Sequence, residues 1–363
     1  MIARTSSGTE QATRQLLDAL VADGDTPGFQ YVFASADRLL LAHHGGFANP
    51  RARRPVEVDT SFNAYSITKT FTAAAVLQLV EQGGVDLDRP IALYCDRWPQ
   101  IGTATVRQTL LHTAGFANPN PLSWVHLDDE HAAFDRGRFV DELLSAHGRP
   151  RSKPGARYAY SNIGYLLLGE LIARVSGLPC AQYLAQHLIE PLRLCNGETL
   201  ALKLPNPATH ACGTLKRFGW LNAVLGLMID RDRLVDDTAG RWVQLRNHHV
   251  NGDAYGGLIG NAHGLARYAQ ALLARDDFLS PASRALLFTA QPGPGPTRSL
   301  GWFLGRLDGE PWCAHPGGGA GYYGELRLYP RIGRASVVMF NRTGLRDEHV
   351  LDRLDRLLVA GRC

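Results

Sequence analysis

The sequence predicts an α/β (α+β) fold, in which one antiparallel sheet is built from both ends of the chain. Strand-like runs occupy residues 28–48, four more follow between residues 299 and 342, and helical patterns dominate from residue 66 to about 288. Strands at both ends with helices between them predict a sheet flanked by helices and interrupted by a helical insertion.

The whole chain is expected to form a single domain. Its 363 residues are 45% hydrophobic and 20% charged, which is enough for a substantial core, and no linker, repeat or low-complexity stretch divides it. Within residues 1–363 we expect an α/β subdomain of about 1–85 and 290–363. The helical subdomain is expected over about 86–289.

The N-terminal part begins with an amphipathic helix that starts after Ser7 or Thr9. Residues 28–48 are rich in β-branched and aromatic side chains and predict two strands joined around Ala36-Asp37. This hairpin is the N-terminal contribution to the sheet.

The C-terminal part contains the four remaining strands, with turns at Asp308-Gly309 and Pro330-Arg331. A closing helix is expected over residues 347–358. Its apolar face consists of Val350, Leu354, Leu357 and Leu358.

A Ser-x-x-Lys pair, Ser66 and Lys69, stands immediately before a helix predicted to be buried. Only four of the 38 basic residues are lysines, and chance predicts about 0.15 such pairs in this chain. Residues three apart share a helix face, so the amine can reach the serine oxygen and accept its proton. Residues 70–82 are apolar on nearly every side and Gly83-Gly84 ends the helix, which argues against an ordinary solvated surface pair.

Two further motifs are Tyr160-Ser161-Asn162 and His315-Pro316-Gly317-Gly318. In this order, and within the flanks PGARYAYSNIGYLLLGELIARVSG and HPGGGAGYYGELRLYP, they resemble the serine β-lactamase and penicillin-binding-protein superfamily. The resemblance is to its class C-like branch, which includes esterases, D-aminopeptidases and D,D-carboxypeptidases, and it covers about residues 25–345. It implies the fold predicted above and a serine hydrolase that needs no cofactor.

The resemblance also implies a role for each motif residue. Ser66 would be the nucleophile that forms an acyl-enzyme, with Lys69 or Tyr160 as the general base. Burial can lower a lysine pKa to about 7–8, and nearby cations would favour a Tyr160 phenolate, so both candidates stay open. Asn162 would hold Lys69 and the substrate carbonyl, while the backbone N–H groups of Ser66 and Gly318 would form the oxyanion hole.

Structural interpretations compete with these roles. Tyr160 is also consistent with a core aromatic residue whose hydroxyl is satisfied, and Asn162 with the N-cap of a helix beginning near Ile163. Gly317 and Gly318 allow the chain to approach a substrate closely, but a flexible loop between strands has the same composition.

His315 stands where β-lactamases of this branch usually carry Lys and where several peptidases carry His. A mostly neutral imidazole is a weaker anchor for a substrate carboxylate than lysine. We therefore expect poor turnover of β-lactams. Hydrolysis of carboxylate-bearing substrates is expected to improve as the imidazole gains charge near its reference pKa of about 6.5.

Other residues near the motifs are assigned less directly. His112 is expected to brace a loop rather than act in catalysis. The run Asp128-Asp129-Glu130 would suit a substrate amino group, but such runs are usually solvated, and we leave it outside the site. Four aromatic residues are candidates either for the acyl pocket or for the core: Trp124, Trp302, Tyr322 and Tyr323.

Composition argues against several kinds of partner. The net charge of +4 is scattered, and the cluster at residues 51–54 is expected to be a surface turn, so nucleic acid is not a predicted partner. No run of about 18 apolar residues and no signal-like segment is visible, so we expect no membrane partner and a cytoplasmic location, or a periplasmic one if a signal has been removed. The oligomeric state is left open.

Cysteine and histidine spacing suggests neither disulfides nor metal. The six cysteines show no regular framework, so buried reduced thiols are expected. The histidines show no His-Glu-x-x-His or similar spacing, so no metal site is predicted.

The function expected from these observations is a serine hydrolase that acts on small esters or on D-amino-acid amides or peptides. An α/β-hydrolase is disfavoured because no Gly-x-Ser-x-Gly occurs. The alternatives are a true β-lactamase or D,D-carboxypeptidase, and a catalytically inactive binding or scaffold homologue.

Overall fold

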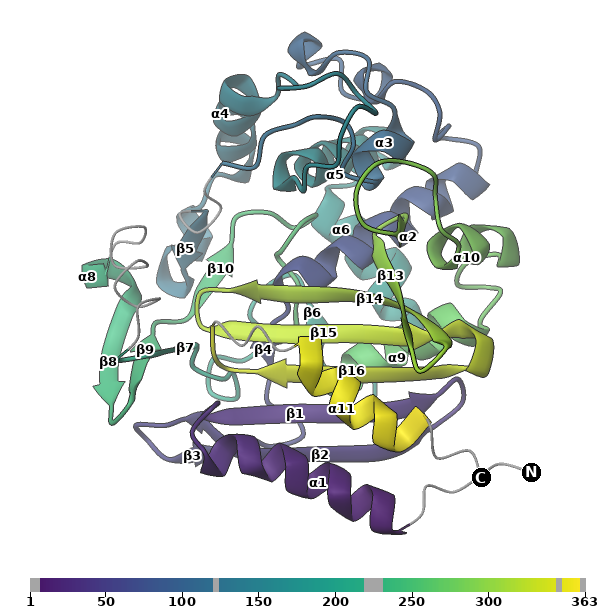
Figure 1. Cartoon of the computed structure of the whole chain (residues 1–363). Coiled ribbons are helices and arrows are strands. Elements are labelled where there is room, and N and C mark those ends of the chain that lie inside the picture. Colours follow the sequence, from purple (N-terminus) through teal and green to yellow (C-terminus); the bar gives the residue numbers. More distant parts are fainter. Residues whose placement is uncertain (1–6, 120–123, 219–230, 344–347, 360–363) are drawn as a thin grey trace.

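The computed structural model describes residues 7–119, 124–218, 231–343 and 348–359. Its centre is an eight-stranded antiparallel sheet (Figure 1). In spatial order its strands are β12 (Arg298–Ser299), β13 (Trp302–Leu307), β14 (Glu310–Gly319), β15 (Tyr322–Tyr329), β16 (Arg334–Phe340), β1 (Gly28–Ser35), β2 (Leu39–Asn49) and β3 (Arg54–Pro55).

The two ends of the chain meet inside this sheet. Strand β1 pairs with β16, with Phe29 opposite Phe340 and Tyr31 opposite Val338, and with β2 on its other side. This pairing confirms the predicted antiparallel sheet built from both termini. The predicted hairpin and the four C-terminal strands are also confirmed.

The terminal helices α1 (Ser7–Ala22) and α11 (Glu348–Val359) lie over one face of the sheet (Figure 1). Between them and the strands is a compact apolar cluster that includes Leu17, Tyr31 and Leu354. The predicted face of the closing helix is confirmed, since Val350 and Leu354 are fully buried. Residue 347, its predicted start, lies outside the described residues.

The opposite face of the sheet carries the helical part of the chain. Helix α9 (Ala262–Ala274) packs on β1 and β16, and α2 (Thr68–Glu81) packs against α5 (Asn162–Ser176). The rings of Phe71 and Tyr268 stack with centroids 3.7 Å apart and join α2 to α9. Helix α2 is therefore buried on nearly every side, as its sequence predicts.

The remaining helices and helical turns connect these elements along the chain. The α-helices are α3 (Val106–Leu110), α4 (Arg136–His147), α6 (Cys180–Leu184), α8 (Arg231–Leu234) and α10 (Pro281–Phe288). The 3₁₀ and π turns are η1 (Tyr65–Ile67), η2 (Ile91–Leu93), η3 (Pro99–Ile101), η5 (Asp128–Ala133), η6 (Ala185–Ile189), η7 (Glu190–Leu192) and η8 (Pro330–Ile332).

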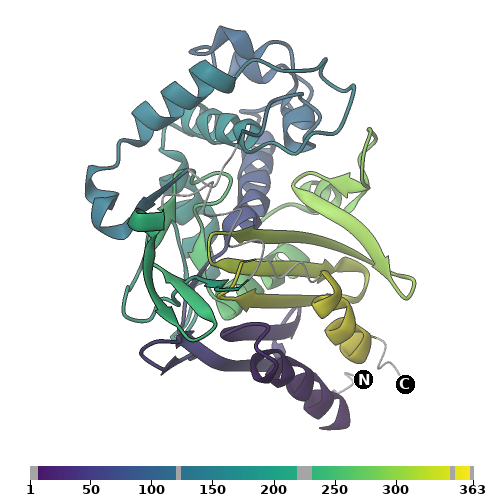
Figure 2. The ribbon, with the colours of Figure 1, turned by 60° about the vertical axis from the view of Figure 1, so that its left-hand side comes forward.

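Helices dominate between residues 66 and 288 as predicted, but short strands that were not predicted lie among them. Small sheets join β10 to β5, β11 to both β4 and β6, and β9 to both β7 and β8; the sheet centred on β9 lies beside the large sheet (Figure 2). Their strands have only two to five residues, too few to show a period of two in the sequence. They are β4 (Phe62–Asn63), β5 (Val125–Leu127), β6 (Leu200–Ala201), β7 (Thr214–Lys216), β8 (Val235–Ala239), β9 (Trp242–Leu245), β10 (His248–Val250) and β11 (Ile259–Gly260).

Two further expectations concern thiols and membranes. The five described cysteines are free; Cys95, Cys180 and Cys313 are buried as expected, but Cys195 is exposed and Cys212 half-buried. Cys363 lies outside the described residues.

Over the described ranges, no single helix has the length and apolarity to cross a membrane, and only the bent pair at 162–176 and 180–192 meets that test jointly.

Candidate active site

Ser66 lies in a strained turn between strand β4 and helix α2. The turn η1 runs directly into α2, so Ser66 occupies the N-terminal end of a continuous helical segment, as the sequence predicts. The preceding residue, Tyr65, has φ = +46°, in the left-handed region that a bulky side chain rarely adopts. Its hydroxyl lies 2.9 Å from His248 Nε2 and 3.1 Å from the Ala320 carbonyl oxygen, and these contacts hold the strained turn in place.

The serine oxygen is contacted by both predicted partners. Lys69 Nζ lies 3.1 Å from Ser66 Oγ, and the Tyr160 hydroxyl donates to the same oxygen over 2.9 Å. Ser66 itself is half-buried. The structure therefore brings together three side chains that are up to 94 positions apart in the sequence.

Lys69 is fully buried and has an unusual set of neighbours. Its amine donates to the Tyr255 carbonyl oxygen over 2.8 Å and lies 4.9 Å from the centroid of the Tyr160 ring. No carboxylate of the described residues lies within ion-pairing distance of it. Burial holds the pKa of Lys69 well below its ordinary value, which favours the neutral amine.

Tyr160 is held by His112. The centroids of the His112 and Tyr160 rings are 4.3 Å apart, and His112 Nδ1 accepts the Ser161 N–H over 3.1 Å. The backbone carbonyl of His112 accepts from the Ala159 N–H. His112 thus braces the loop, as predicted. Burial raises the pKa of Tyr160, and the hydrogen bond to Ser66 only partly opposes this shift. Of the two base candidates left open by the sequence, the phenolate of Tyr160 is thus disfavoured in the resting site by desolvation.

Asn162 is the first residue of α5, but it is not the N-cap. That position belongs to Ser161, whose hydroxyl accepts the Gly164 N–H over 3.1 Å. No hydrogen bond joins Asn162 to Lys69 within the described structure, so that expected contact is also wrong. Asn162 Oδ1 is buried and has no hydrogen-bond partner among the described residues, which leaves an acceptor for another molecule.

Strand β14 lies directly against the Ser66 turn because its glycines have no side chain. A Cβ at Gly317 would come within 2.0 Å of the Ala64 carbonyl oxygen, and one at Gly319 within 2.1 Å of the Tyr65 ring. At Gly318 the nearest atom would be 3.4 Å away, an ordinary contact. The close approach predicted for Gly317 is thus made to the protein's own turn.

His315 differs from its sequence-based expectation. The side chain is 2% exposed, and its Nδ1 lies 2.7 Å from the Pro316 carbonyl oxygen. Burial, reinforced by Lys69, lowers the pKa of His315 to about 3. The imidazole is therefore neutral throughout the physiological range, and the predicted charging near pH 6.5 was wrong.

The other candidates prove to be structural. Trp124, Trp302 and Tyr322 are buried in the core, and the Tyr322 hydroxyl donates to the Ala211 carbonyl over 2.7 Å. Tyr323 is half-buried on the other face of the sheet and stacks on Phe340. The acidic run has partners within the protein: Asp128 Oδ1 lies 2.8 Å from His249 Nε2, Asp129 pairs with Arg246 and Glu130 pairs with Arg233.

Sequence analysis missed two residues that shape this site. Tyr65 contributes a strained backbone, and Tyr255 contributes a carbonyl group to Lys69. Neither role depends on a side-chain motif, because a backbone angle and a backbone carbonyl leave no mark in the sequence.

Comparison with known proteins identifies the family. The Beta-lactamase family model matches residues 13–360. The chain is 26% identical to penicillin-binding protein 4* of Bacillus subtilis over 323 residues (86% of this chain, 67% of that protein). It is 27% identical to penicillin-binding protein 4 of Amycolatopsis lactamdurans over 352 residues (90% and 84%).

Solved structures share the fold. D-amino acid amidase from Ochrobactrum anthropi superposes with a TM-score of 0.80 at 19% identity, covering 98% of this chain and 100% of that one. SurE with D-Leu superposes with a TM-score of 0.70 at 27% identity, covering 98% and 77%. The chain therefore belongs to the Beta-lactamase family, whose fold is shared by penicillin-binding proteins and an amidase.

Proposed function

We propose that this member of the Beta-lactamase family is a serine hydrolase that works through an acyl-enzyme on Ser66. The observation that carries the proposal is the convergence of a buried amine and a phenol on one serine oxygen, at 3.1 Å and 2.9 Å. A serine hydroxyl is a weak nucleophile until an adjacent base takes its proton. A Lys with a lowered pKa is such a base.

In the acylation step, Lys69 Nζ accepts the Ser66 proton while Oγ bonds to the carbonyl carbon of the substrate. We assign the base role to Lys69 rather than Tyr160, because burial favours a neutral amine and disfavours a phenolate. The backbone N–H groups of Ser66 and Gly318 are assigned to the resulting oxyanion. Collapse breaks the bond to the alcohol or amine, which leaves with a proton from the Tyr160 hydroxyl, and the Lys69 ammonium restores that proton.

In the deacylation step, water attacks the acyl carbon and gives its proton to the same pair of groups. The ester bond to Ser66 breaks, Oγ regains a proton, and a carboxylic acid leaves. The sum is hydrolysis of one ester or amide bond with no cofactor. Asn162 Oδ1, which has no partner in the described structure, is suited to accept an N–H group of the substrate.

The substrates we propose are small neutral esters and D-amino-acid amides or peptides. A neutral His315 does not supply the fixed charge that a lysine would offer to a carboxylate. The likeness to SurE with D-Leu supports the D-amino-acid side of this proposal. The penicillin-binding relatives favour the second candidate, a D,D-carboxypeptidase or β-lactamase.

Two experiments on the purified chain test the proposal. First, a fluorophosphonate probe should label the wild type rapidly at Ser66, as located by peptide mass spectrometry. Ser66→Ala should abolish labelling and turnover with little change in Tm, since loss of a nucleophile removes several orders of magnitude in kcat. Ser176→Ala, a half-buried serine on α5, is the matched control.

Second, steady-state rates for p-nitrophenyl acetate, a D-amino-acid amide, a D-Ala-D-Ala peptide and nitrocefin decide the substrate class. We expect the ester or the amide to be turned over best. Nitrocefin turnover as efficient as that of the best ester would show instead that the protein is a true β-lactamase. Absence of labelling would point to an inactive scaffold.

A further inference from the structure

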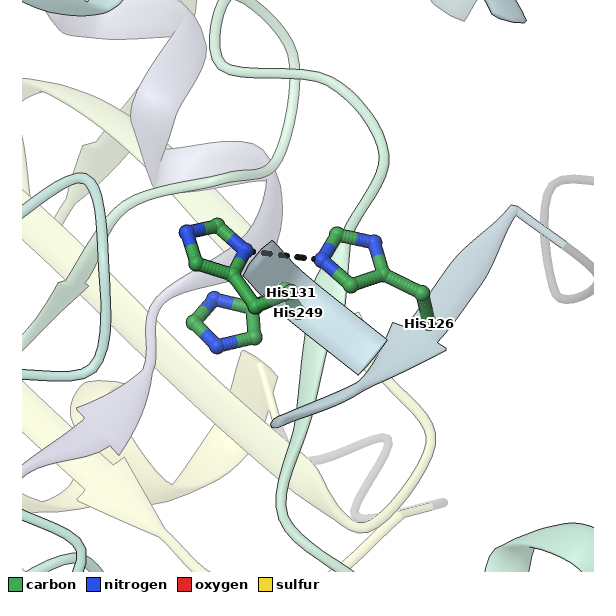
Figure 3. Close-up of side chains that lie close together, drawn as sticks. All are labelled: His126, His131 and His249. Carbon is green, nitrogen blue, oxygen red and sulfur yellow. Dashed lines mark hydrogen bonds between the residues drawn. The ribbon is translucent and has the colours of Figure 1, made fainter. Parts of the chain in front are cut away.

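Three histidines outside the Ser66 site lie together at the edge of the small β5–β10 sheet (Figure 3). His126 on β5 pairs directly with His249 on β10, and His131 follows in η5, the turn that continues from β5. One nitrogen atom from each ring lies within 4.8 Å of the other two. We call these three residues the histidine cluster.

The three rings are close enough for one ion to contact them all. His126 Nε2 and His131 Nδ1 share a hydrogen bond of 2.8 Å, and the rings of His131 and His249 stack with centroids 4.0 Å apart, so a bound ion would replace the shared proton and the rings would turn toward it. Imidazole is mostly neutral near pH 7 and then carries one lone pair for a metal. Three imidazoles with one further open position are a common ligand set for Zn²⁺.

Two neighbouring oxygens orient the rings. Asn251 Oδ1 lies 2.7 Å from His126 Nδ1, and Asp128 Oδ1 lies 2.8 Å from His249 Nε2. An oxygen acceptor favours the N–H on the nitrogen that it faces, so the other nitrogen of the ring keeps its lone pair. Metal-bound histidines are typically held in this way by a carboxylate or carbonyl group.

The cluster is accessible from one side. His126 and His249 are buried, but His131 is exposed, and all three line a cavity of about 660 Å³. The cavity is also lined by apolar side chains such as Ile189 and Leu200 and by charged ones such as Glu190 and Lys203. An ion can therefore enter beside His131, and a water molecule or an anionic ligand has room at the open coordination position.

We propose that the histidine cluster binds a divalent transition metal, represented by Zn²⁺, with His126, His131 and His249 as ligands. Such an ion would fasten η5 to β10. The chain that continues from β10 carries the Tyr255 carbonyl group that accepts from Lys69. The sequence-based expectation of no metal site rested on spacing, and no spacing motif relates His249 to residues more than a hundred positions earlier.

Titration of the untagged, chelator-stripped chain with Zn²⁺ by isothermal calorimetry tests this site. We expect one ion per wild-type chain. His131→Ala removes an exposed ligand and should weaken binding at least about 100-fold, more than the 10–100-fold typical of losing an orienting group. Asp128→Asn should fall in that smaller range. His187→Ala is the matched control, because His187 is also exposed and stacked on an aromatic ring, and its affinity should equal the wild type's.

Stability gives a second readout that is independent of hydrolysis. An ion that binds only the folded state raises Tm, so Zn²⁺ should raise the Tm of the wild type and of His187→Ala but not of His131→Ala. Circular dichroism without metal verifies that His131→Ala is folded. Equal Zn²⁺ affinity in His131→Ala and wild type, or less than one ion per wild-type chain, would overturn the proposal whatever the esterase assays show.

Discussion

Two basic side chains are buried on opposite faces of the central sheet, and their surroundings differ in charge. Arg327 on β15 faces the terminal helices, is 2% exposed, and meets Glu325 at 2.9 Å, Asp352 at 2.6 Å and Asp355 at 3.5 Å. Lys69, on the face with α2, is 0% exposed and meets hydroxyl and carbonyl oxygens instead of carboxylates.

The consequence is a difference in protonation. Burial opposes the charge of both residues, but Glu325 and Asp355 outweigh burial at Arg327 and raise its pKa, whereas at Lys69 burial lowers the pKa without opposition from a carboxylate. Burial also raises the pKa of Glu325 to about 7. The nearby carboxylates Asp355 and Asp352 add to this shift, and Arg327 opposes it. The paired Arg327 thus stays charged and supports the fold, whereas the unpaired Lys69 favours the neutral amine, which can accept a proton.

The largest expected effect is the loss of turnover in Lys69→Met. Removing the base should lower kcat by at least about 10²-fold. Stability should not fall: burial lowers the pKa of Lys69 in the folded chain, so the unfolded chain binds this proton more readily, the wild type loses stability as pH falls below the unfolded lysine pKa, and methionine removes this loss. Steady-state kinetics and Tm at pH 7 measure both. A lower Tm with unchanged kcat would show that Lys69 stabilises the fold, as Arg327 does, and is not the base.

Tyr160→Phe should also lower kcat at least about 10²-fold, because the phenol is assigned to proton transfer. Combined with Lys69→Met, the loss should be far smaller than the product of the two single losses, since both groups act on one Ser66 proton. A double mutant whose loss equals that product would show that the two groups work independently.

Arg327→Met should show the opposite pattern. Removing one partner of a buried ion cluster leaves uncompensated carboxylates and typically costs about 3–5 kcal/mol of unfolding free energy. Urea denaturation measures this cost, while kcat of the folded fraction should stay near the wild-type value. Arg356→Met is the matched control, because its carboxylate partner Asp308 is 3.6 Å away and both side chains are more than half exposed.

The smallest effect concerns His315. With a pKa near 3 the imidazole does not change charge between pH 5 and 9, so it adds no pH-dependent attraction for a carboxylate. The kcat/KM profiles of a neutral ester and its carboxylated analogue should therefore run parallel over that range. A rise in kcat/KM below pH 7 for the carboxylated ester alone would show that His315 becomes charged near its reference pKa after all.

The fold was largely predictable from the sequence because its elements have strong local signals. Strand-like composition at both ends, the apolar residues 70–82 and the Gly83-Gly84 stop predict β1, β2, the C-terminal strands and α2, and the structure confirms them. The short strands between residues 125 and 260 were missed, since their pairing depends on tertiary contacts rather than on local pattern.

The sequence motifs predicted which side chains lie together in the site. They did not predict the pKa values of those side chains, because these depend on burial. Ser66, Lys69 and Tyr160 lie together as the motif order predicts. The pKa of His315 and of Tyr160 depends on desolvation, which the sequence does not show. Ser161 instead of Asn162 became the N-cap because the helix starts one residue earlier than its apolar pattern implies.

The central claim is that neutral Lys69 activates Ser66, and the pH dependence of Ser66 labelling tests it most directly. The second-order rate of fluorophosphonate labelling should rise with a pKa well below the ordinary lysine value of about 10.4 and reach a plateau before the pH arrives at that value. Lys69→Met should abolish that dependence and label slowly at every pH. A wild-type rate that keeps rising beyond pH 10, or a Lys69→Met variant that labels as fast as the wild type, would contradict the account.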